Sequence, residues 1–258
     1  MTTAQFILSG WTWNPVVLLT GACALVIYLA AFRDRRRIGW FTAALAVFLL
    51  TLLSPLNTLA DGYLFSAHMA QHILLLLIVP ALLLFSLPRT ISLAVGPRVF
   101  SYPLFGWLAG TGAMWFWHAP AMCNAAVASR PVHALQTVSL VVLGSLFWRQ
   151  ILAPRDEERL SPPRAIFYLF SACVACSVLG IIITFSPVTV CSIYTMPMTD
   201  RLGLLHIIRT GWGFSPERDQ QIGGLLMWVP MCLIYLTAIL AQLARWFAQE
   251  TGPATESI

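Results

Sequence analysis

The sequence predicts an all-α integral membrane protein, built as a single domain over residues 1–258: a bundle of seven transmembrane helices. Of its 258 residues 59% are apolar and only 10% are charged, against roughly a quarter charged in soluble proteins. The mean hydropathy is +0.79. Apolar stretches of about 20 residues, the length that crosses a bilayer, recur along the chain. A membrane β-barrel would instead alternate apolar and polar residues over about ten positions.

The apolar stretches predict seven spans, which in chain order are residues 15–32, 39–59, 63–87, 101–121, 131–152, 164–187 and 216–247. No basic residues precede the first stretch, so it is expected to remain as a span rather than to be a cleaved signal peptide. Pro131 and Pro216 stand just after serines at predicted helix starts, a capping pattern. Pro80 and Pro230 fall inside spans, where neighbouring helices can satisfy the freed backbone groups.

The arginines predict the orientation of the bundle, because all 15 basic residues are arginine. Four of them, Arg130, Arg201, Arg209 and Arg218, fall on one side of the predicted spans, and the other eleven fall on the opposite side. The positive-inside rule makes the arginine-rich side cytoplasmic. The N-terminus is therefore expected outside and the C-terminus in the cytoplasm. No basic run alternates with aromatic residues, so the expected partner is the lipid bilayer and not a nucleic acid.

The six cysteines imply no disulfide framework. Cys23, Cys173, Cys176 and Cys232 fall inside apolar stretches, where a buried cysteine behaves as a small hydrophobe. Cys173 and Cys176 form a C-x-x-C in the middle of the sixth span. Without a second pair, packing is the simpler interpretation, and soft-metal binding in transit is the alternative.

All five histidines are expected at or near the outer side. They are His68 and His72 at the start of the third span, His118 at the end of the fourth, His133 at the start of the fifth, and His206 in the loop 188–215, which also holds Met196 and Met198. His68 and His72 are four residues apart, so their rings share one helix face and can converge on one ion. The alternative is a pair that hydrogen-bonds between helices. HMAQH lacks the glutamate of a zinc protease helix, so no protease is predicted.

The last span opens with a pattern that adds candidate residues. Asp219 lies in its first turn, where the helix dipole favours a carboxylate. Gly223 and Gly224 allow another helix to approach closely. Met227 lies about 12 Å deeper than Asp219 at 1.5 Å per residue, which is also the depth expected of His72. Thioether plus imidazole favours Cu(I), whereas a core methionine that merely fills space is the alternative.

Four motifs in register resemble one family. They are HMAQHILLLLIVPALLLFSLP (residues 68–88), WHAP (117–120), the VHAL…LFW stretch (132–148) and DQQIGGLLMWVP (219–230). The chain resembles the multi-span cytochrome c oxidase assembly factor CtaG, of the Caa-type oxidase kind. It does not resemble the single-span copper chaperone that shares this name. The resemblance implies a multi-pass protein of the bacterial inner membrane that serves respiratory chain biogenesis and is not an enzyme.

The resemblance also implies a metallochaperone role, in which Cu(I) is held near the outer face and passed to cytochrome c oxidase subunit I. A periplasmic copper chaperone is a further partner that this role implies. The expected metal ligands are His68, His72, His118, His133, Met227 and Asp219. One departure is Thr137, which stands where the family pattern often carries a second histidine after His133.

Two other functions stay open from the sequence. A membrane haem-binding or electron-transfer protein could use His68 and His118 as axial ligands. A metal-free chaperone of oxidase subunits would use its histidines only for hydrogen bonds between helices. Copper transport across the membrane is a weaker fourth idea, because the inner half of the bundle carries few polar groups.

Overall fold

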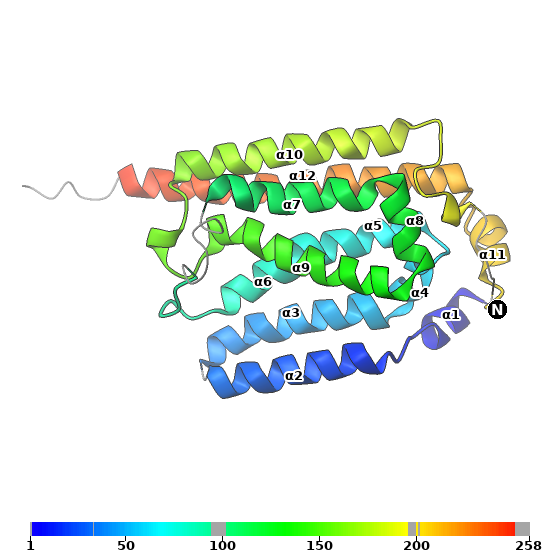
Figure 1. The fold of residues 1–258 in the computed structure, drawn as a ribbon, viewed down its shortest axis with the longest axis horizontal. Helices are drawn as coiled ribbons and strands as arrows, with labels where there is room; N and C mark the ends of the chain where they lie inside the picture. The colour runs from blue at the N-terminus through cyan, green and yellow to red at the C-terminus, as the bar shows by residue number, and fades with distance from the viewer. Residues whose placement is uncertain (1, 33, 94–101, 196–199, 201, 251–258) are drawn as a thin grey trace, which may run out of the picture.

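A computed structural model describes residues 2–32, 34–93, 102–195, 200 and 202–250, and every regular element within these ranges is a helix. Met196, Met198 and Arg201, which the predicted outer loop contains, lie outside the described residues. The long helices run side by side and alternate in direction along the chain (Figure 1). The N-terminus lies at one end of the bundle, and the last helix ends at the other (Figure 1).

The long helical segments correspond to the predicted stretches. In chain order they are α2 (Pro15–Ala31), α3 (Arg35–Leu53), α5 (Phe65–Ile73) continued by η1 (Leu74–Ile78) and α6 (Val79–Ser86), α7 (Pro103–His118), α9 (Arg130–Leu152), α10 (Pro162–Phe185) and α12 (Pro216–Glu250). The shorter elements are α1 (Thr3–Ser9), α4 (Pro55–Ala60), α8 (Pro120–Ala128), η3 (Asp156–Glu158), η4 (Ser192–Tyr194), α11 (Leu204–His206) and η5 (Ile207–Gly211). The described part of the predicted loop 188–215 therefore contains three short helices.

Within the described residues, four helical segments are long and apolar enough to cross a membrane: Phe65–Ser86, Arg130–Leu152, Pro162–Phe185 and Pro216–Glu250. Pro15–Ala31 and Arg37–Leu53 are shorter apolar helices. Large apolar side chains such as Leu19, Phe167 and Leu233 are exposed, which suits a surface in contact with lipid. The all-helical membrane fold is thus supported, whereas the count of seven crossings and the orientation stay predictions.

Two predicted spans end too late. The stretch 39–59 breaks at Leu53, because the Ser54 side chain accepts a hydrogen bond from the Leu56 backbone and caps a new helix with Pro55 in its first turn. The stretch 101–121 breaks at His118, because Pro120 begins α8. Proline disfavours a helical conformation in the residue before it, and Ala119 is extended at ψ 132°.

The third span contains a π-helical turn, η1, directly before α6. Pro80 has no N–H to donate to the Leu76 carbonyl, so the α-helical pattern is interrupted here. Helix α9 approaches at the same place: a Cβ at Gly144 would collide with the Leu76 carbonyl oxygen and would lie 2.9 Å from Pro80 Cγ. Gly144 therefore permits the close packing of the two segments that carry His68, His72 and His133.

A disulfide joins Cys123 of α8 to Cys191, just before η4, with a Cα–Cα distance of 5.8 Å. The expectation of no disulfide is wrong for this pair. The other four cysteines are free, and Cys23 is exposed, so the expectation that it packs as a buried hydrophobe is also wrong. Cys123 and Cys191 fall outside the helices that could span the membrane and on one predicted side of it, and that shared placement is the sequence signal for their pairing.

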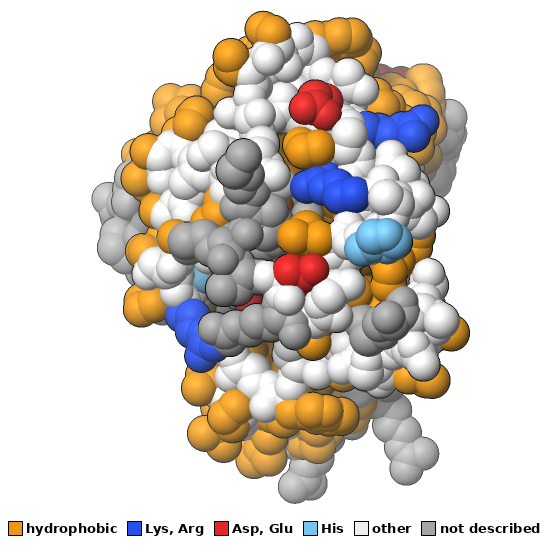
Figure 2. Space-filling model, turned by 90° about the vertical axis from the view of Figure 1, so that its right-hand side faces the viewer, with side chains coloured by type: hydrophobic (Ala, Val, Ile, Leu, Met, Phe, Trp, Pro, Cys, Tyr) orange, Lys and Arg blue, Asp and Glu red, His pale blue; other side chains and the backbone are white. Residues whose placement is uncertain are grey.

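One end of the bundle, here called the histidine end, is formed by the start of α5, the end of α7 and the starts of α9 and α12 (Figure 1). Helices α1, α4, α8 and α11 lie over this end (Figure 1). Figure 2 shows its face, on which charged side chains are scattered among apolar ones. Asp61, His206, Glu217 and Arg218 are exposed.

Candidate functional site

Three helices bring four of the five histidines together at the histidine end. His68 and His72 come from α5, His118 is the last residue of α7, and His133 lies in the first turn of α9. The ring centroids are 4.5 Å apart for His68 and His72, 4.9 Å for His72 and His118, and 6.3 Å for His68 and His133. The four rings form a row from His133 to His118, here called the histidine cluster. His206 is exposed and stands apart from it.

The histidine cluster is buried and poorly satisfied. His68, His72 and His118 are 2%, 1% and 4% exposed. Among the described residues, Nε2 of His68 and both ring nitrogens of His72 have no hydrogen-bond partner. Gln136 lies close enough to interact with His72, but short of hydrogen-bond geometry. Since buried polar atoms are nearly always paired, these three ring nitrogens make the cluster a candidate ligand site.

His118 shows which of its nitrogens is available. Its Nδ1 lies 2.5 Å from the carbonyl oxygen of Met114, and that contact requires the proton on Nδ1. Nε2 then carries the lone pair, and it lies 2.9 Å from Sδ of Met69. A histidine that binds a metal commonly donates its other N–H to a carbonyl in this way.

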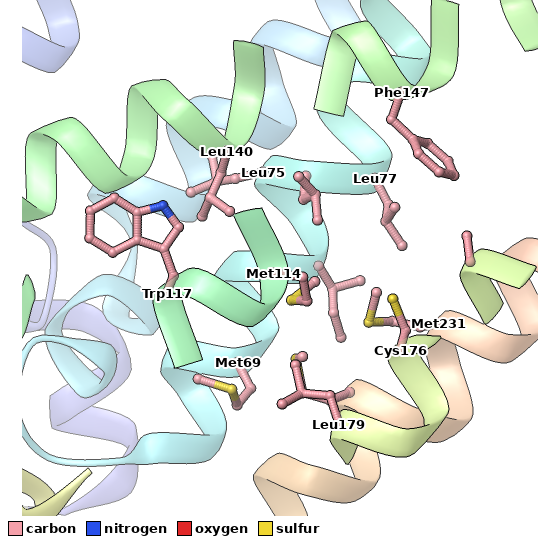
Figure 3. Packing of buried hydrophobic residues seen from close by; sticks show 14 of the residues in the cluster. Met69, Leu75, Leu77, Met114, Trp117, Leu140, Phe147, Cys176, Leu179 and Met231 are labelled. Carbon is pink, nitrogen blue, oxygen red and sulfur yellow. The ribbon is translucent and has the colours of Figure 1, made fainter. Parts of the chain in front are cut away.

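Met69 is the residue that sequence reasoning missed. It is completely buried on α5, three residues before His72 and therefore on the same helix face. Figure 3 shows Met69 from α5 and Met114 from α7 within one apolar core. Met227, the thioether expected from depth, is buried on α12 in this same core. The HMAQH motif itself was the available signal, because its methionine shares the face of its second histidine.

The Asp219 carboxylate contacts the start of α5 and does not lie in the row of histidine rings. Its two carboxylate oxygens accept the backbone N–H groups of Phe65, at 2.7 Å, and Ser66, at 3.0 Å. The residue preceding α5, Leu64, provides no side-chain cap. A buried carboxylate at a helix N-terminus satisfies the free amides and complements the dipole. Asp219 thus positions the helix that carries two of the histidines, while its role as a ligand stays a prediction.

Asp219 is brought to α5 by close packing of α12. A Cβ at Gly223 would lie 2.5 Å from Phe65 Cδ1 and 3.2 Å from Met69 Cγ. The neighbouring Gly224 faces Gly180 and Thr184 of α10, where a Cβ would lie 2.9 Å from the Gly180 carbonyl oxygen. The expectation that these two glycines admit other helices is therefore confirmed.

The segment around η4 covers His68. The Tyr194 ring lies 6.1 Å from the His68 ring, and its hydroxyl donates to the Ala60 carbonyl at 2.7 Å. Burial, with some repulsion from Asp219 and Asp61, raises the pKa of Tyr194 well above its ordinary value, so the phenol stays neutral. The Cys123–Cys191 disulfide and a 2.8 Å hydrogen bond from the Val190 N–H to Gln220 hold the same segment.

The structure shows the contacts of Thr137, which stands where the family pattern often carries a second histidine. The Thr137 hydroxyl donates to the His133 carbonyl within α9, at 3.0 Å. The adjacent Gln136 is 1% exposed and faces His72 instead. The polar side chain of α9 that faces the middle of the cluster is thus the Gln136 amide and not a histidine.

The ligand set is not already arranged around one point. Within the described part of the chain, no three His, Cys, Asp or Glu side chains form a group that could hold a metal ion. Adjacent rings are close, but the row is extended. The tightest group is His72, His118 and Met69, which combines two imidazoles with a thioether, and His68 adjoins it. These residues fit a soft ion of low coordination number.

A bundle of apolar helices with buried imidazoles at one end defines a multi-helix membrane protein. Residues 23–249 match the family described as cytochrome c oxidase caa3 assembly factor (Caa3_CtaG), and the chain belongs to that family. The matched range contains every residue of the histidine cluster, and it confirms the resemblance seen in the four motifs.

The similar proteins are much longer than this chain. An uncharacterized protein of Mycobacterium leprae is 24% identical over 93% of this chain and 40% of its own length. Uncharacterized proteins of Mycobacterium bovis and Mycobacterium tuberculosis are each 23% identical over 98% of this chain and 42% of their own length. The chain therefore spans less than half of these curated relatives. No solved structure matches it.

Proposed function

We propose that this protein is an assembly factor for haem–copper cytochrome c oxidase that holds Cu(I) in the histidine cluster and delivers it to the catalytic subunit. One observation carries the proposal: His72 lies between His68 and His118 with both ring nitrogens unpaired in the described structure, and a thioether faces His118. Family membership supplies the assembly role.

The chemistry of the cluster favours Cu(I) over other ions. Imidazole and thioether are neutral and soft, and they select Cu(I). Structural zinc sites are tetrahedral and commonly use thiolates. One carboxylate at this end of the bundle, Asp219, already accepts two backbone N–H groups. A monovalent ion also carries less charge into a buried site than a divalent one.

The proposed delivery takes place at the outer face of the bacterial inner membrane. The arginine distribution supports this orientation, and so does the disulfide at the histidine end, because disulfides persist in the periplasm and not in the cytoplasm. The protein then docks beside oxidase subunit I within the bilayer, and a periplasmic copper chaperone supplies the ion. The role requires binding and release but no catalysis.

A haem-binding function has less support. Bis-histidine haem places the macrocycle between its two axial ligands. The predicted axial pair, His68 and His118, instead has the His72 ring next to both, at 4.5 and 4.9 Å. Two cavities of the described structure, one bordered by Tyr28 and Arg149 and the other by Trp117 and Ser139, are lined by no histidine.

The test is metal content by mass spectrometry on the full chain, purified in detergent after anaerobic loading with Cu(I). The wild type should hold about one copper more per chain than a His68→Ala/His72→Ala variant that keeps its helical content. His206→Ala is the matched control, because His206 is exposed and outside the cluster. Equal copper in the wild type and the double variant would contradict the copper role and leave a chaperone of polypeptide.

A further inference from the structure

Two thiols from different helices meet in the middle of the bundle. Cys173 of α10 and Cys232 of α12 have their sulfur atoms 3.3 Å apart, although they are 59 residues apart in the chain. Both side chains are half-buried. The hydroxyl of Ser177, one turn after Cys173, lies 3.1 Å from the Cys232 sulfur. Cys173 and Cys232 are here called the thiol pair.

Further sulfur atoms lie beside the thiol pair. Cys176 is buried on α10, with its sulfur 3.9 Å from the Tyr235 hydroxyl. Met231 directly precedes Cys232 on α12, and Figure 3 shows Met231 and Cys176 within one buried cluster. Sulfur ligands therefore gather along the α10–α12 contact.

The thiol pair is separate from the histidine cluster. At 1.5 Å per residue, Cys173 lies about 16 Å from the Pro162 end of α10 and about 18 Å from the Phe185 end, and so near mid-span. By the same rise His72 lies only about 10 Å from the start of α5.

We propose that Cys173 and Cys232 form a second metal site, which binds Cu(I) between two thiolates. Thiolate is the softest protein ligand and selects Cu(I). No third His, Cys, Asp or Glu completes a metal-binding group here in the described residues. Two ligands suffice for Cu(I), which accepts linear coordination, whereas a structural zinc site needs four.

Binding balances without any redox change. Cu(I) replaces the protons of both thiols, two S–H bonds are exchanged for two Cu–S bonds, and two protons leave to water. The product carries one negative charge. The Ser177 hydroxyl, which donates to the Cys173 carbonyl at 2.8 Å, can offset that charge by turning to donate to the Cys232 sulfur, 3.1 Å away. The sulfur atoms must move apart from 3.3 Å to admit the ion, and their partial exposure allows that motion. Because the ligands must lose protons, Cu(I) binding weakens as the pH falls.

The experiment removes the histidine cluster first, so that its result is independent of the proposed function. The full-length His68→Ala/His72→Ala protein is loaded anaerobically with Cu(I), and its copper is counted and its ligands identified by X-ray absorption. About one copper with a sulfur-only shell is expected. Adding Cys173→Ser and Cys232→Ser should remove it. Cys23→Ser is the matched control, since Cys23 is an exposed free thiol on another helix.

Three results would overturn the proposal: no copper above the level of the combined variant, a nitrogen-containing shell, or loss of the copper in Cys23→Ser. A second measurement leaves both cysteines of the thiol pair in place, so it tests the proposal even if the serine variants fold poorly. Alkylation by N-ethylmaleimide is followed residue by residue with mass spectrometry, with and without Cu(I). Cu(I) should slow alkylation of Cys173 and Cys232 together, and equal rates would refute the site.

Discussion

The histidine cluster and the thiol pair offer soft ligands in opposite ways. The cluster draws nitrogen and sulfur from three helices, and its surroundings are fixed by a disulfide, by Asp219 on the start of α5 and by a hydrogen bond that orients His118. The thiol pair uses sulfur from two helices, is half-buried and must open to bind. As proposed Cu(I) sites, the more firmly held cluster should release its ion more slowly than the thiol pair.

The largest effect should follow loss of the disulfide that holds the cover of the cluster. Cys123→Ser/Cys191→Ser removes a link across 68 residues and should cost about 2–4 kcal/mol of stability. The segment over His68 loosens, so Cu(I) should leave the cluster faster, while the thiol pair keeps its affinity. Thermal unfolding in detergent and transfer of copper to a chelator measure both effects. An unchanged melting temperature and transfer rate, matching Cys23→Ser, would contradict this view.

The next largest effect should follow Gly144→Ala, which forces α9 away from the π-helical turn. The added Cβ would collide with the Leu76 carbonyl oxygen, and overpacking of this kind costs about 1–3 kcal/mol. The histidine cluster, which these two segments share, should lose copper, whereas the α10–α12 contact should not change. Gly112→Ala is the control, since nothing lies within 4 Å of its Cβ. If both variants melt alike, the close approach at Gly144 is unimportant.

Asp219 can be tested as a positioning residue against the ligand that the sequence predicts. Asp219→Ala leaves the N–H groups of Phe65 and Ser66 without an acceptor, at about 1–3 kcal/mol, and Asp219→Asn keeps one acceptor and should lose less. Positioning predicts that copper affinity falls in step with the melting temperature across the two variants. A ligand would instead lose copper equally in both, with the Asn variant still stable.

The all-helical membrane character was predictable because apolar runs of bilayer length are local features, and the shared face of His68 and His72 depends only on helix periodicity. Contacts between distant segments were not. Asp219 reaches a helix start 154 residues earlier in the chain, and the Cys123–Cys191 pairing depends on how α8 meets the last loop. The prolines that mark the breaks at Pro55 and Pro120 were visible in the sequence. A hydropathy average did not register the breaks, because apolar residues outnumber polar ones around them.

The smallest expected effect distinguishes Met69 from Met227 as the thioether ligand. Met69→Leu keeps the volume of a buried side chain, so stability should fall by less than about 1.5 kcal/mol. If Met69 is a ligand beside His118, Cu(I) affinity should fall by about tenfold, which corresponds to about 1.4 kcal/mol. Met227→Leu makes the same chemical change at the position that depth alone predicts, and it should leave affinity near the wild-type value. Competition with a Cu(I) chelator measures both. If Met227→Leu lowered the Cu(I) affinity more than Met69→Leu, the thioether ligand would be Met227 on α12. The 2.9 Å contact between Met69 and His118 would then be packing alone.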